Sequence, residues 1–569
     1  MAQSIATLLA ALLMSAPAVA QQPTAIPAIP GGPGMPAGAP ARDTGARTGT
    51  ARIRGHVIAA ENGTPLRKAQ VRVMSPELRE NRVTTTDAQG AYELKDLPAG
   101  RYTVTASKGS FVTLQYGQTR PLQQGRPLEV LDGQTLDKVD LALPRGSIVT
   151  GRIVDEFGEP IADVQVMPMR YQYMQGRRRL TPTGRGSQTN DIGEYRLFGL
   201  APGQYYVSAT LRNFSFGESD DRSGYAPTYY PGTANPSEAQ RVNVDLGQAM
   251  NDVNFSLVAT RTAKVSGVVL DSQGRPLSMG MVMAMPRGGV MMFGPSGNGQ
   301  IRPDGSFAVS GLAPGEYTLR ANAPPSGDGI PEFAIADVTV NGDDVNGVRL
   351  ATARMIIASG RVVFNDPAAA QSLRPSSIRL MGMPANPDES MMFMGGGGGA
   401  VKDDYTFEVR MPPGKMLIRL GGPPMPGWTI KAVRQNGVDV TDTGVEFMAG
   451  SDVGGLEVEF TNQVTEISGL VTNARGAAVK DYSVLVFSED RDRWGSNTRY
   501  RAIGRPDQEG RFKIRTLPPG RYYVVAVEYL DPSDSGDPEY LDRVRTKATT
   551  LTVNEGETKV VDLKVQSVS

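Results

Sequence analysis

The sequence predicts an all-β protein built as a tandem array of about five antiparallel β-sandwich modules. A pattern of strands and turns recurs along most of the chain with a period of about one hundred residues, the length of a domain rather than of a solenoid repeat. Glycine and proline account for 66 and 42 of the 569 residues, which indicates many turns. Short apolar–polar alternations are frequent, and no long segment shows the period of an amphipathic helix.

Each repeat begins with a predicted strand centred on a glycine. A turn and a second alternating strand follow it, as in ENGTPL and VRVM of the first repeat. Alternation of this kind is typical of a strand with one face on a core. The five opening segments are IRGHVI at 53–58, VTGRIV at 149–154, VSGVVL at 265–270, ASGRVV at 358–363 and ISGLVT at 467–472.

The later part of each repeat reads turn, strand, turn, strand, as in DAQGAYELKDLPAGRYTV from Asp87. Asp87 can bond the backbone two residues on, and Gly90 accepts a positive φ. We expect Tyr102, after the second turn, to bury its ring and to bond its hydroxyl to the backbone of that turn. The fourth repeat departs, with Met416 at this position and Tyr405 where a turn glycine is expected. The equivalent tyrosines elsewhere are Tyr205, Tyr317 and Tyr522.

The N-terminus predicts export. An apolar run from Ile5 to Met14 precedes the cleavage motif Ala18-Val19-Ala20, so residues 1–20 are expected to be a signal peptide. No Lys or Arg precedes the run, which leaves open a start further upstream. We expect a periplasmic or extracellular protein with no transmembrane segment in the mature chain. A Pro/Gly/Ala linker at 21–50 then leads to sandwiches at 51–144, 145–259, 260–353, 354–463 (degenerate) and 464–569.

Composition argues against most catalytic classes. The chain has no cysteine and one histidine, His56, which excludes disulfides, thiolate catalysis and Cys-type zinc sites and makes a Ser-His-Asp triad improbable. Lys+Arg and Asp+Glu both number 59, so nothing favours nucleic acid. No acidic pair of the glycosidase kind stands apart from the repeats. We therefore expect a non-catalytic protein without a cofactor or metal.

The repeat motif D-x-x-G-x-[FY]-x-[LIV]-x-x-L-x-[PA]-G-x-Y resembles that of the carboxypeptidase regulatory-like domain. This domain is a transthyretin-like (prealbumin-like), Ig-like sandwich grouped with starch-binding-like folds. The resemblance covers nearly everything from 51 to 569, and the stretch 225–248 looks like a segment of tandem arrays in exported bacterial proteins. It implies a fold and binding of carbohydrate or polymer, and it gives no catalytic residues.

Aromatic residues outside the repeat pattern are the predicted carbohydrate-binding residues. Aromatic rings on loops can stack on sugar rings. The alternative is that these loops fold back and pack on the sandwich edge. An arginine run at 177–179, with Arg185, is either a solvated loop or a contact for an acidic polymer. The predicted set comprises Tyr171, Tyr173, Tyr225, Tyr229, Tyr230, Trp428, Trp494 and Tyr500.

Two further groups of residues allow a metal but favour plainer explanations. Methionines at 279, 281, 283, 285, 291, 292, 381, 383, 391, 392 and 394 could hold Cu(I), although they suit packing better. Acidic residues at 220–221 and 531–542 could bind calcium, although their spacing matches no EF-hand and solvated loops are favoured.

Three functions are consistent with these features. The first is an exported, non-catalytic protein that binds a polysaccharide or envelope polymer through sandwich loops. The second is a structural or adhesive stalk that binds protein partners. The third is an accessory subunit of a separately encoded hydrolase or transporter.

Overall fold

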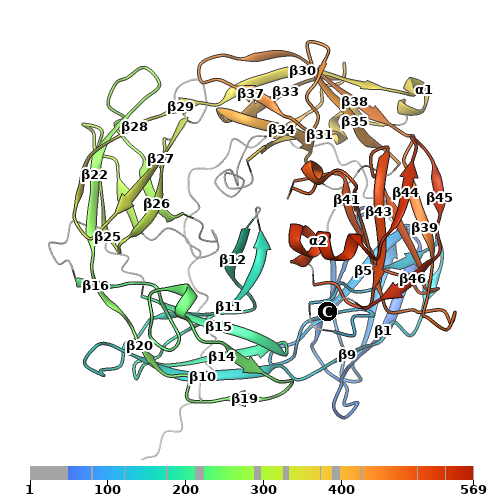
Figure 1. Ribbon diagram of the computed structural model, residues 1–569, viewed down its shortest axis with the longest axis horizontal. Coiled ribbons are helices and arrows are strands. Elements are labelled where there is room, and N and C mark those ends of the chain that lie inside the picture. The colour runs from blue at the N-terminus through green and yellow to red at the C-terminus, as the bar shows by residue number, and fades with distance from the viewer. Residues whose placement is uncertain are drawn as a thin grey trace, which may run out of the picture. The chain divides into compact units, whose positions relative to one another are not determined.

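The computed structural model describes residues 49–78, 81–120, 122–174, 177–211, 223–287, 297–323, 332–371, 373–386, 398–422, 425, 427–495, 497–531 and 533–567 (Figure 1). The predicted signal peptide and most of the predicted linker lie outside these residues, as do Met291, Met292, Met391, Met392, Met394, Asp220 and Asp221. The described chain is almost entirely β-structure, which confirms the predicted fold class. Among the described residues, no helix is both long and apolar enough to span a bilayer.

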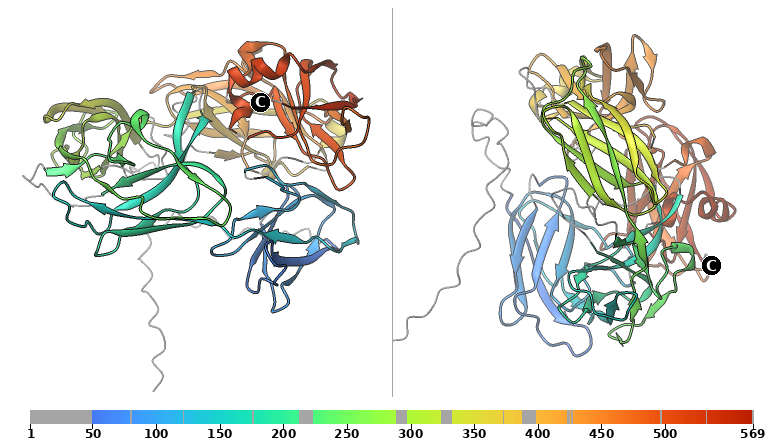
Figure 2. Two further views of the ribbon diagram at one scale, coloured as in Figure 1. Left: turned by 60° about the horizontal axis from the view of Figure 1, so that its bottom comes forward. Right: turned by 90° about the vertical axis from the view of Figure 1, so that its left-hand side faces the viewer.

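Five hydrophobic clusters each draw their residues from one stretch of the chain. They fall within 51–143, 149–257, 263–350, 356–460 and 467–563. Strands of each stretch surround its cluster, and Figure 2 shows these layers edge-on in the stretch from β22 to β28. We call the bodies sandwich 1 to sandwich 5, in chain order.

Sandwich 1 consists of two sheets. Along β1 the buried and exposed residues alternate, as the period of two predicts. One sheet contains β1 (Ala51–Ala59), β4 (Ala91–Leu97), β8 (Thr135–Leu136) and β9 (Leu141–Leu143). The other contains β2 (Gln70–Met74), β3 (Arg82–Thr85), β5 (Gly100–Ser107), β6 (Leu114–Gln115) and β7 (Leu128–Val130).

Sandwich 2 repeats this plan with a longer hairpin, β11–β12. Its first sheet contains β10 (Ser147–Val154), β14 (Glu194–Leu200), β19 (Ala249–Met250) and β20 (Phe255–Ser256). Its second contains β11 (Gln165–Met174), β12 (Arg177–Pro182), β13 (Ser187–Gln188), β15 (Gly203–Thr210), β17 (Thr228–Tyr229) and β18 (Val242–Val244). A short pair, β16 (Ser223–Tyr225) and β21 (Ala259–Arg261), and a 3-10 turn, η1 (Pro236–Glu238), complete it.

Sandwiches 3 and 4 also have two sheets each. Sandwich 3 contains β22 (Ala263–Leu270), β25 (Ser306–Leu312) and β28 (Val345–Ala351), then β23 (Met281–Pro286), β24 (Gly297–Gln300), β26 (Gly315–Asn322), β27 (Glu332–Val340) and β29 (Ala353–Arg354). Sandwich 4 contains β30 (Ile356–Phe364), β33 (Thr406–Met411), β35 (Thr429–Gln435), β36 (Val438–Asp439) and β38 (Val453–Thr461), then β31 (Arg379–Pro384), β32 (Gly398–Ala400), β34 (Gly414–Leu420) and β37 (Val445–Phe447). Its helical turns are α1 (Pro367–Ala370) and η3 (Pro375–Ser377).

Sandwich 5 differs in having one continuous sheet and a helix. Strand β46 pairs with β39 at one end and with β43 at the other, which joins the two halves. The strands are β39 (Glu466–Thr472), β40 (Ser483–Ser488), β41 (Arg501–Gly504), β42 (Arg511–Arg515), β43 (Gly520–Val527), β44 (Thr549–Val553), β45 (Thr558–Val560) and β46 (Leu563–Gln566). The helical elements are η5 (Arg491–Arg493), η6 (Asp534–Gly536) and α2 (Pro538–Arg545), the last of which lies against β43 (Figure 1).

The glycine of each opening strand marks a close approach of two backbones. In every sandwich the first strand pairs in parallel with the end of the same repeat, so the sheets are not purely antiparallel. A Cβ on Gly55 would lie 2.0 Å from the carbonyl oxygen of Val139, and one on Gly151 would lie 2.1 Å from that of Val253. The same approach occurs at Gly267, Gly360 and Gly469. Only glycine fits there.

The tyrosine after the second turn behaves as predicted. Its hydroxyl donates to the carbonyl oxygen four residues earlier in sandwiches 1, 2, 3 and 5, at 2.5, 2.6, 2.8 and 2.6 Å. In sandwich 4 the fully buried side chain of Met416 takes the place of the ring. Tyr405 there has φ of 63°, the left-handed conformation for which the other repeats use glycine.

Candidate functional site

Both tryptophans of the predicted carbohydrate-binding set are buried. Trp428 is 7% exposed and meets Phe364 edge-on, with ring centroids 5.2 Å apart. Trp494 is 3% exposed, meets Phe487 at 5.5 Å and donates its indole N–H to the carbonyl oxygen of Ser488 at 2.7 Å. Rings packed in this way present no face to a ligand, because both belong to hydrophobic clusters.

Most of the predicted tyrosines are held by protein contacts. Tyr500 is 8% exposed and donates its hydroxyl to Asp442 at 2.9 Å, and burial raises its pKa. Tyr225 donates to Glu156 at 3.0 Å, and partial burial together with this bond raises its pKa to about 12. Tyr230 meets Phe255 edge-on, and Tyr229 is half-buried. Here the loops pack on the sandwich, the alternative that the sequence left open.

Tyr171 is the predicted aromatic residue that lies in a hollow. Its side chain is 38% exposed, and it meets Tyr206 edge-on, with ring centroids 5.2 Å apart. Tyr173, two residues further along β11, is half-buried, and burial raises its pKa. The hollow has a volume of about 430 Å³. We call its lining the Arg–Tyr surface: Arg170, Tyr171, Arg178, Gln204, Tyr206 and Arg241.

Strand alternation builds this surface. On β15 the core tyrosine Tyr205 is followed by Tyr206, so Tyr206 points to the outer face of the sheet. The pairing of β11 with β15 sets Met169 opposite Tyr206, which brings Tyr171 next to it. Arg241 lies immediately before β18, beside the other edge of β15. Together with Arg178 of β12, residues of β11 and β15 and the residue before β18 therefore form one outer surface of sandwich 2.

Hydrogen bonds orient part of the surface. Arg241 donates to the hydroxyl of Tyr206 at 2.9 Å and to the side-chain oxygen of Gln204 at 3.2 Å. The guanidinium of Arg170 lies 5.3 Å from the ring centroid of Tyr205, and its Nη1 atom is buried without a hydrogen-bond partner among the described residues. The result is a fixed aromatic pair edged by guanidinium groups.

The charge of the surface is positive. No Asp or Glu occurs among the residues that line it. An acidic residue of sandwich 5 interacts with this surface: burial, Asp531 and Asp537 raise the pKa of Asp534 of η6, and Arg178 opposes this shift. The arginine run is divided, because Arg178 belongs to the Arg–Tyr surface whereas Arg185 lies in a different cleft.

Sequence reasoning missed Tyr206, Gln204, Arg170 and Arg241. A signal for Tyr206 exists, since two consecutive tyrosines on a strand must face opposite ways and the first was already assigned to the core. Arg241 carried no such signal, because only the pairing of β18 with β15 brings it to this face.

The other candidates form no evident metal centre. Among the described residues, no group of three or more His, Cys, Asp or Glu side chains is placed to hold a metal ion. His56 is exposed, with Nδ1 3.4 Å from Asp140. On β23, Val282 and Ala284 face the core while Met281, Met283 and Met285 lie on the outer face, so these methionines do not fill the core.

The similar solved structures are bacterial proteins, among them pilins, and the similarity is low. A streptococcal ancillary pilin is 14% identical, covers 53% of this chain and 98% of its own, and has a TM-score of 0.20. The minor pilin of Streptococcus agalactiae is 12% identical, with coverages of 37% and 96% and a TM-score of 0.20. The TIE protein of Bacillus anthracis is 10% identical, with coverages of 90% and 73% and a TM-score of 0.14. At these scores none of them bears on what this chain does.

Sequence comparison is informative for the first sandwich. No curated protein matches the chain. Residues 52–144 match the family model of the carboxypeptidase regulatory-like domain, as the repeat motif in this part of the chain predicts.

Proposed function

We propose that this protein is an exported, non-catalytic binding protein that contacts a polysaccharide of the cell envelope through the Arg–Tyr surface of sandwich 2. The observation that carries the proposal is the exposed face of Tyr171, held by Tyr206 inside a hollow that three arginines line. The ring of Tyr171 is already partly in contact with water, and stacking on a sugar ring would bury this apolar face favourably.

The polar groups suit the hydroxyls and acidic groups of a sugar chain. Gln204 offers both a donor and an acceptor, and Arg241 is held in place by its bonds to Gln204 and Tyr206. Arginine also binds carboxylates in a bidentate way, so an acidic polysaccharide is favoured over a neutral one. The hollow offers no carboxylate to act as acid or base, which supports binding without hydrolysis.

Affinity electrophoresis of the full chain through gels that contain neutral or acidic polysaccharides tests the proposal. We expect an acidic polysaccharide to retard the protein and Tyr171→Ala to weaken binding by roughly tenfold, the loss of one stacking contact of about 1.4 kcal/mol. The matched control is Phe157→Ala, which removes an aromatic ring that is 84% exposed elsewhere on sandwich 2.

Two outcomes would overturn the proposal. One is that no polysaccharide retards the wild-type chain. The other is that Tyr171→Ala and Phe157→Ala bind equally well, since the hollow would then have no part in the binding.

A further inference from the structure

The connection between sandwich 1 and sandwich 2 is fixed by backbone hydrogen bonds. The loop 108–113, which follows β5, runs beside the connecting segment. The Val112 N–H donates to the carbonyl oxygen of Pro144 at 3.0 Å, and the Gly146 N–H donates to that of Ser110 at 2.9 Å. These two bonds hold the loop 108–113 against the connecting segment.

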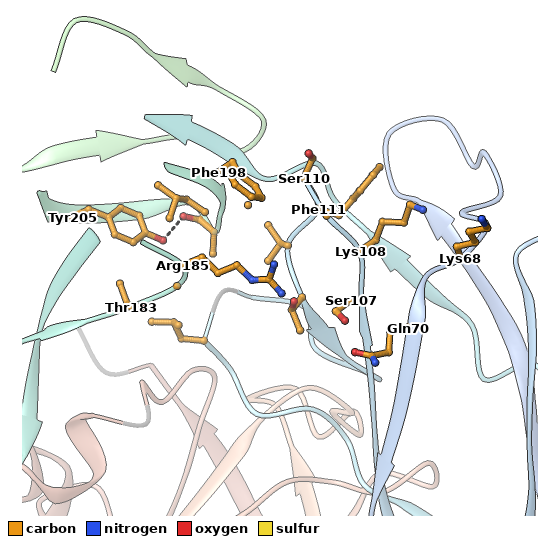
Figure 3. Close-up of a pocket in the computed structure, with 18 residues that line it drawn as sticks. Lys68, Gln70, Ser107, Lys108, Ser110, Phe111, Thr183, Arg185, Phe198 and Tyr205 are labelled. Carbon is orange, nitrogen blue, oxygen red and sulfur yellow. Dashed lines mark hydrogen bonds between the residues drawn. The ribbon is translucent and has the colours of Figure 1, made fainter. Parts of the chain in front are cut away.

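A cleft of about 490 Å³ opens at the junction (Figure 3). Sandwich 1 contributes Lys68, Lys108 and Phe111 to its walls, and sandwich 2 contributes Arg185 and Phe198. Figure 3 shows the Arg185 side chain extending from sandwich 2 towards the side on which the two lysines lie. None of these residues belongs to the Arg–Tyr surface.

All the charge in this cleft has one sign. Three cations line it, and no Asp or Glu is among its lining residues. Lys108 donates to the carbonyl oxygen of Arg67 at 2.5 Å, and none of the three cations forms an ion pair with another described residue. Like charges that line one cleft repel each other, and an oxyanion bound in the cleft would attract all of them. Arg185 can bind such a group in a bidentate way.

The uncharged residues that line the cleft suit a ligand with a compact ring, such as a sugar. The rings of Phe111 and Phe198 are half-buried, and the guanidinium of Arg196 lies 5.4 Å from the centroid of Phe198. Hydroxyls of Ser107 and Thr183 also line the cleft and can bond ligand oxygens. This mixture of apolar, hydroxyl and cationic groups matches a sugar ring that carries a carboxylate, sulfate or phosphate.

From these observations we infer that the junction cleft binds an acidic sugar unit, and that the bound unit joins sandwich 1 to sandwich 2. The cations come from both sandwiches, so a ligand that contacts all three stabilises their docking and slows opening of the loop 108–113. The site is additional to the Arg–Tyr surface and does not depend on it.

Calorimetric titration of the full chain tests the site, with galacturonate, its short oligomers and inorganic phosphate as probes. We expect binding at low ionic strength that weakens as salt is added, because the attraction is electrostatic. Arg185→Gln should weaken binding by about tenfold or more, and the double variant Lys68→Gln, Lys108→Gln by at least as much. The matched control is Arg152→Gln, which removes one positive charge from the other sheet of sandwich 2.

Hydrogen–deuterium exchange distinguishes binding in the cleft from nonspecific attraction of an anion to the protein, because only binding in the cleft should protect the loop 108–113. Exchange across 108–113 should slow when the oligomer is present in the wild-type chain and in Arg152→Gln, and should not change in Arg185→Gln. A monomer that binds as tightly as its oligomers identifies a free acidic sugar as the ligand, and a rise in affinity with length identifies a polymer segment. Both support the site.

The inference is overturned if no probe binds at low salt, or if Arg185→Gln and Arg152→Gln weaken binding equally. Tyr171→Ala separates this site from the proposed function, because it should lower polysaccharide retention without changing the titration of the monomer.

Discussion

Sandwich 2 and sandwich 5 share a central antiparallel pair of strands, β11 with β15 and β40 with β43, but the outer face of this pair differs between them. In sandwich 5 the pairing of β40 with β43 sets Leu485 opposite Val525 on the outer face. At the equivalent place in sandwich 2, the pairing of β11 with β15 sets Met167 opposite Ser208. The face is apolar in one sandwich and mixed in the other.

The elements that pack on this outer face differ between the two sandwiches in the same way. In sandwich 5, α2 and Trp494 lie on the apolar face and form a hydrophobic cluster separate from the main core. In sandwich 2 the corresponding face has no described helix of its own, although η6 of sandwich 5 contacts β11, and residues on and around β11 form the Arg–Tyr surface. An apolar sheet face is stabilised when other elements bury it, whereas a face with enough polar side chains can remain exposed and bind a ligand.

The largest effect should come from breaking the cover of sandwich 5. Leu541→Asp places a charge at a fully buried position of α2 and should destabilise this part of sandwich 5 by about 4 kcal/mol or more. Hydrogen–deuterium exchange across 520–527 is expected to accelerate strongly, while polysaccharide retention stays unchanged. Thr546→Asp, at the exposed C-terminal end of the same helix, is the control. Unchanged exchange in Leu541→Asp would show that α2 does not protect the face.

The glycine of the opening strand should matter equally in both sandwiches. Gly151→Ala and Gly469→Ala each drive a Cβ into a backbone carbonyl oxygen, 2.1 and 2.0 Å away. We expect each to cost about 1–3 kcal/mol, the usual range for overpacking, as measured by denaturant unfolding. Gly495→Ala meets no atom within 4 Å and should be nearly neutral. A large difference between the first two variants would contradict the shared architecture.

The corner tyrosines should make both sandwiches sensitive to alkali. Burial raises the pKa of Tyr205 and of Tyr522 above the ordinary value of about 10. Their contribution is therefore complete below pH 10 and is lost as the pH rises towards the folded-state pKa. Unfolding followed against pH should show this loss, and tyrosinate absorbance should show delayed ionisation.

Phenylalanine variants sharpen the same test. Tyr205→Phe and Tyr522→Phe each remove a hydroxyl bond of 2.6 Å and should cost about 1 kcal/mol at neutral pH. Each variant should also lose part of the alkaline sensitivity. If the alkaline transition of both variants matched that of the wild type, other groups would be responsible for it.

The smallest effect should come from the cap of α2. Asp537 accepts a hydrogen bond from the Glu539 N–H at 2.9 Å at the helix N-terminus, so Asp537→Ala should cost about 1 kcal/mol of local stability. Exchange across 538–545 should accelerate modestly. Glu528→Ala removes an exposed negative charge from the same sandwich and should leave that exchange unchanged. If exchange across 538–545 were equal in Asp537→Ala and Glu528→Ala, the Asp537 cap would make no measurable contribution to the stability of α2.

Much of the fold could be predicted because its signals are local. Turn residues, alternation and the tyrosine of each second turn identify strands and their core faces, and the structure places Tyr102 and its equivalents accordingly. The helix α2 was missed, although the continuous apolar run VLVF of β40 carried a signal, since a strand buried on both faces does not alternate.

The repeat, the turns and the core-facing side of each strand follow from local sequence, because these features depend on neighbours within a few residues. Three features became visible only in the folded chain: which outer faces are covered, that Trp494 is buried while Tyr171 lies in a hollow, and that Arg178 and Arg185 line different clefts. Those outcomes depend on strand pairing and on contacts between segments far apart in the chain, and local alternation does not specify which distant segment will come to lie on a given face.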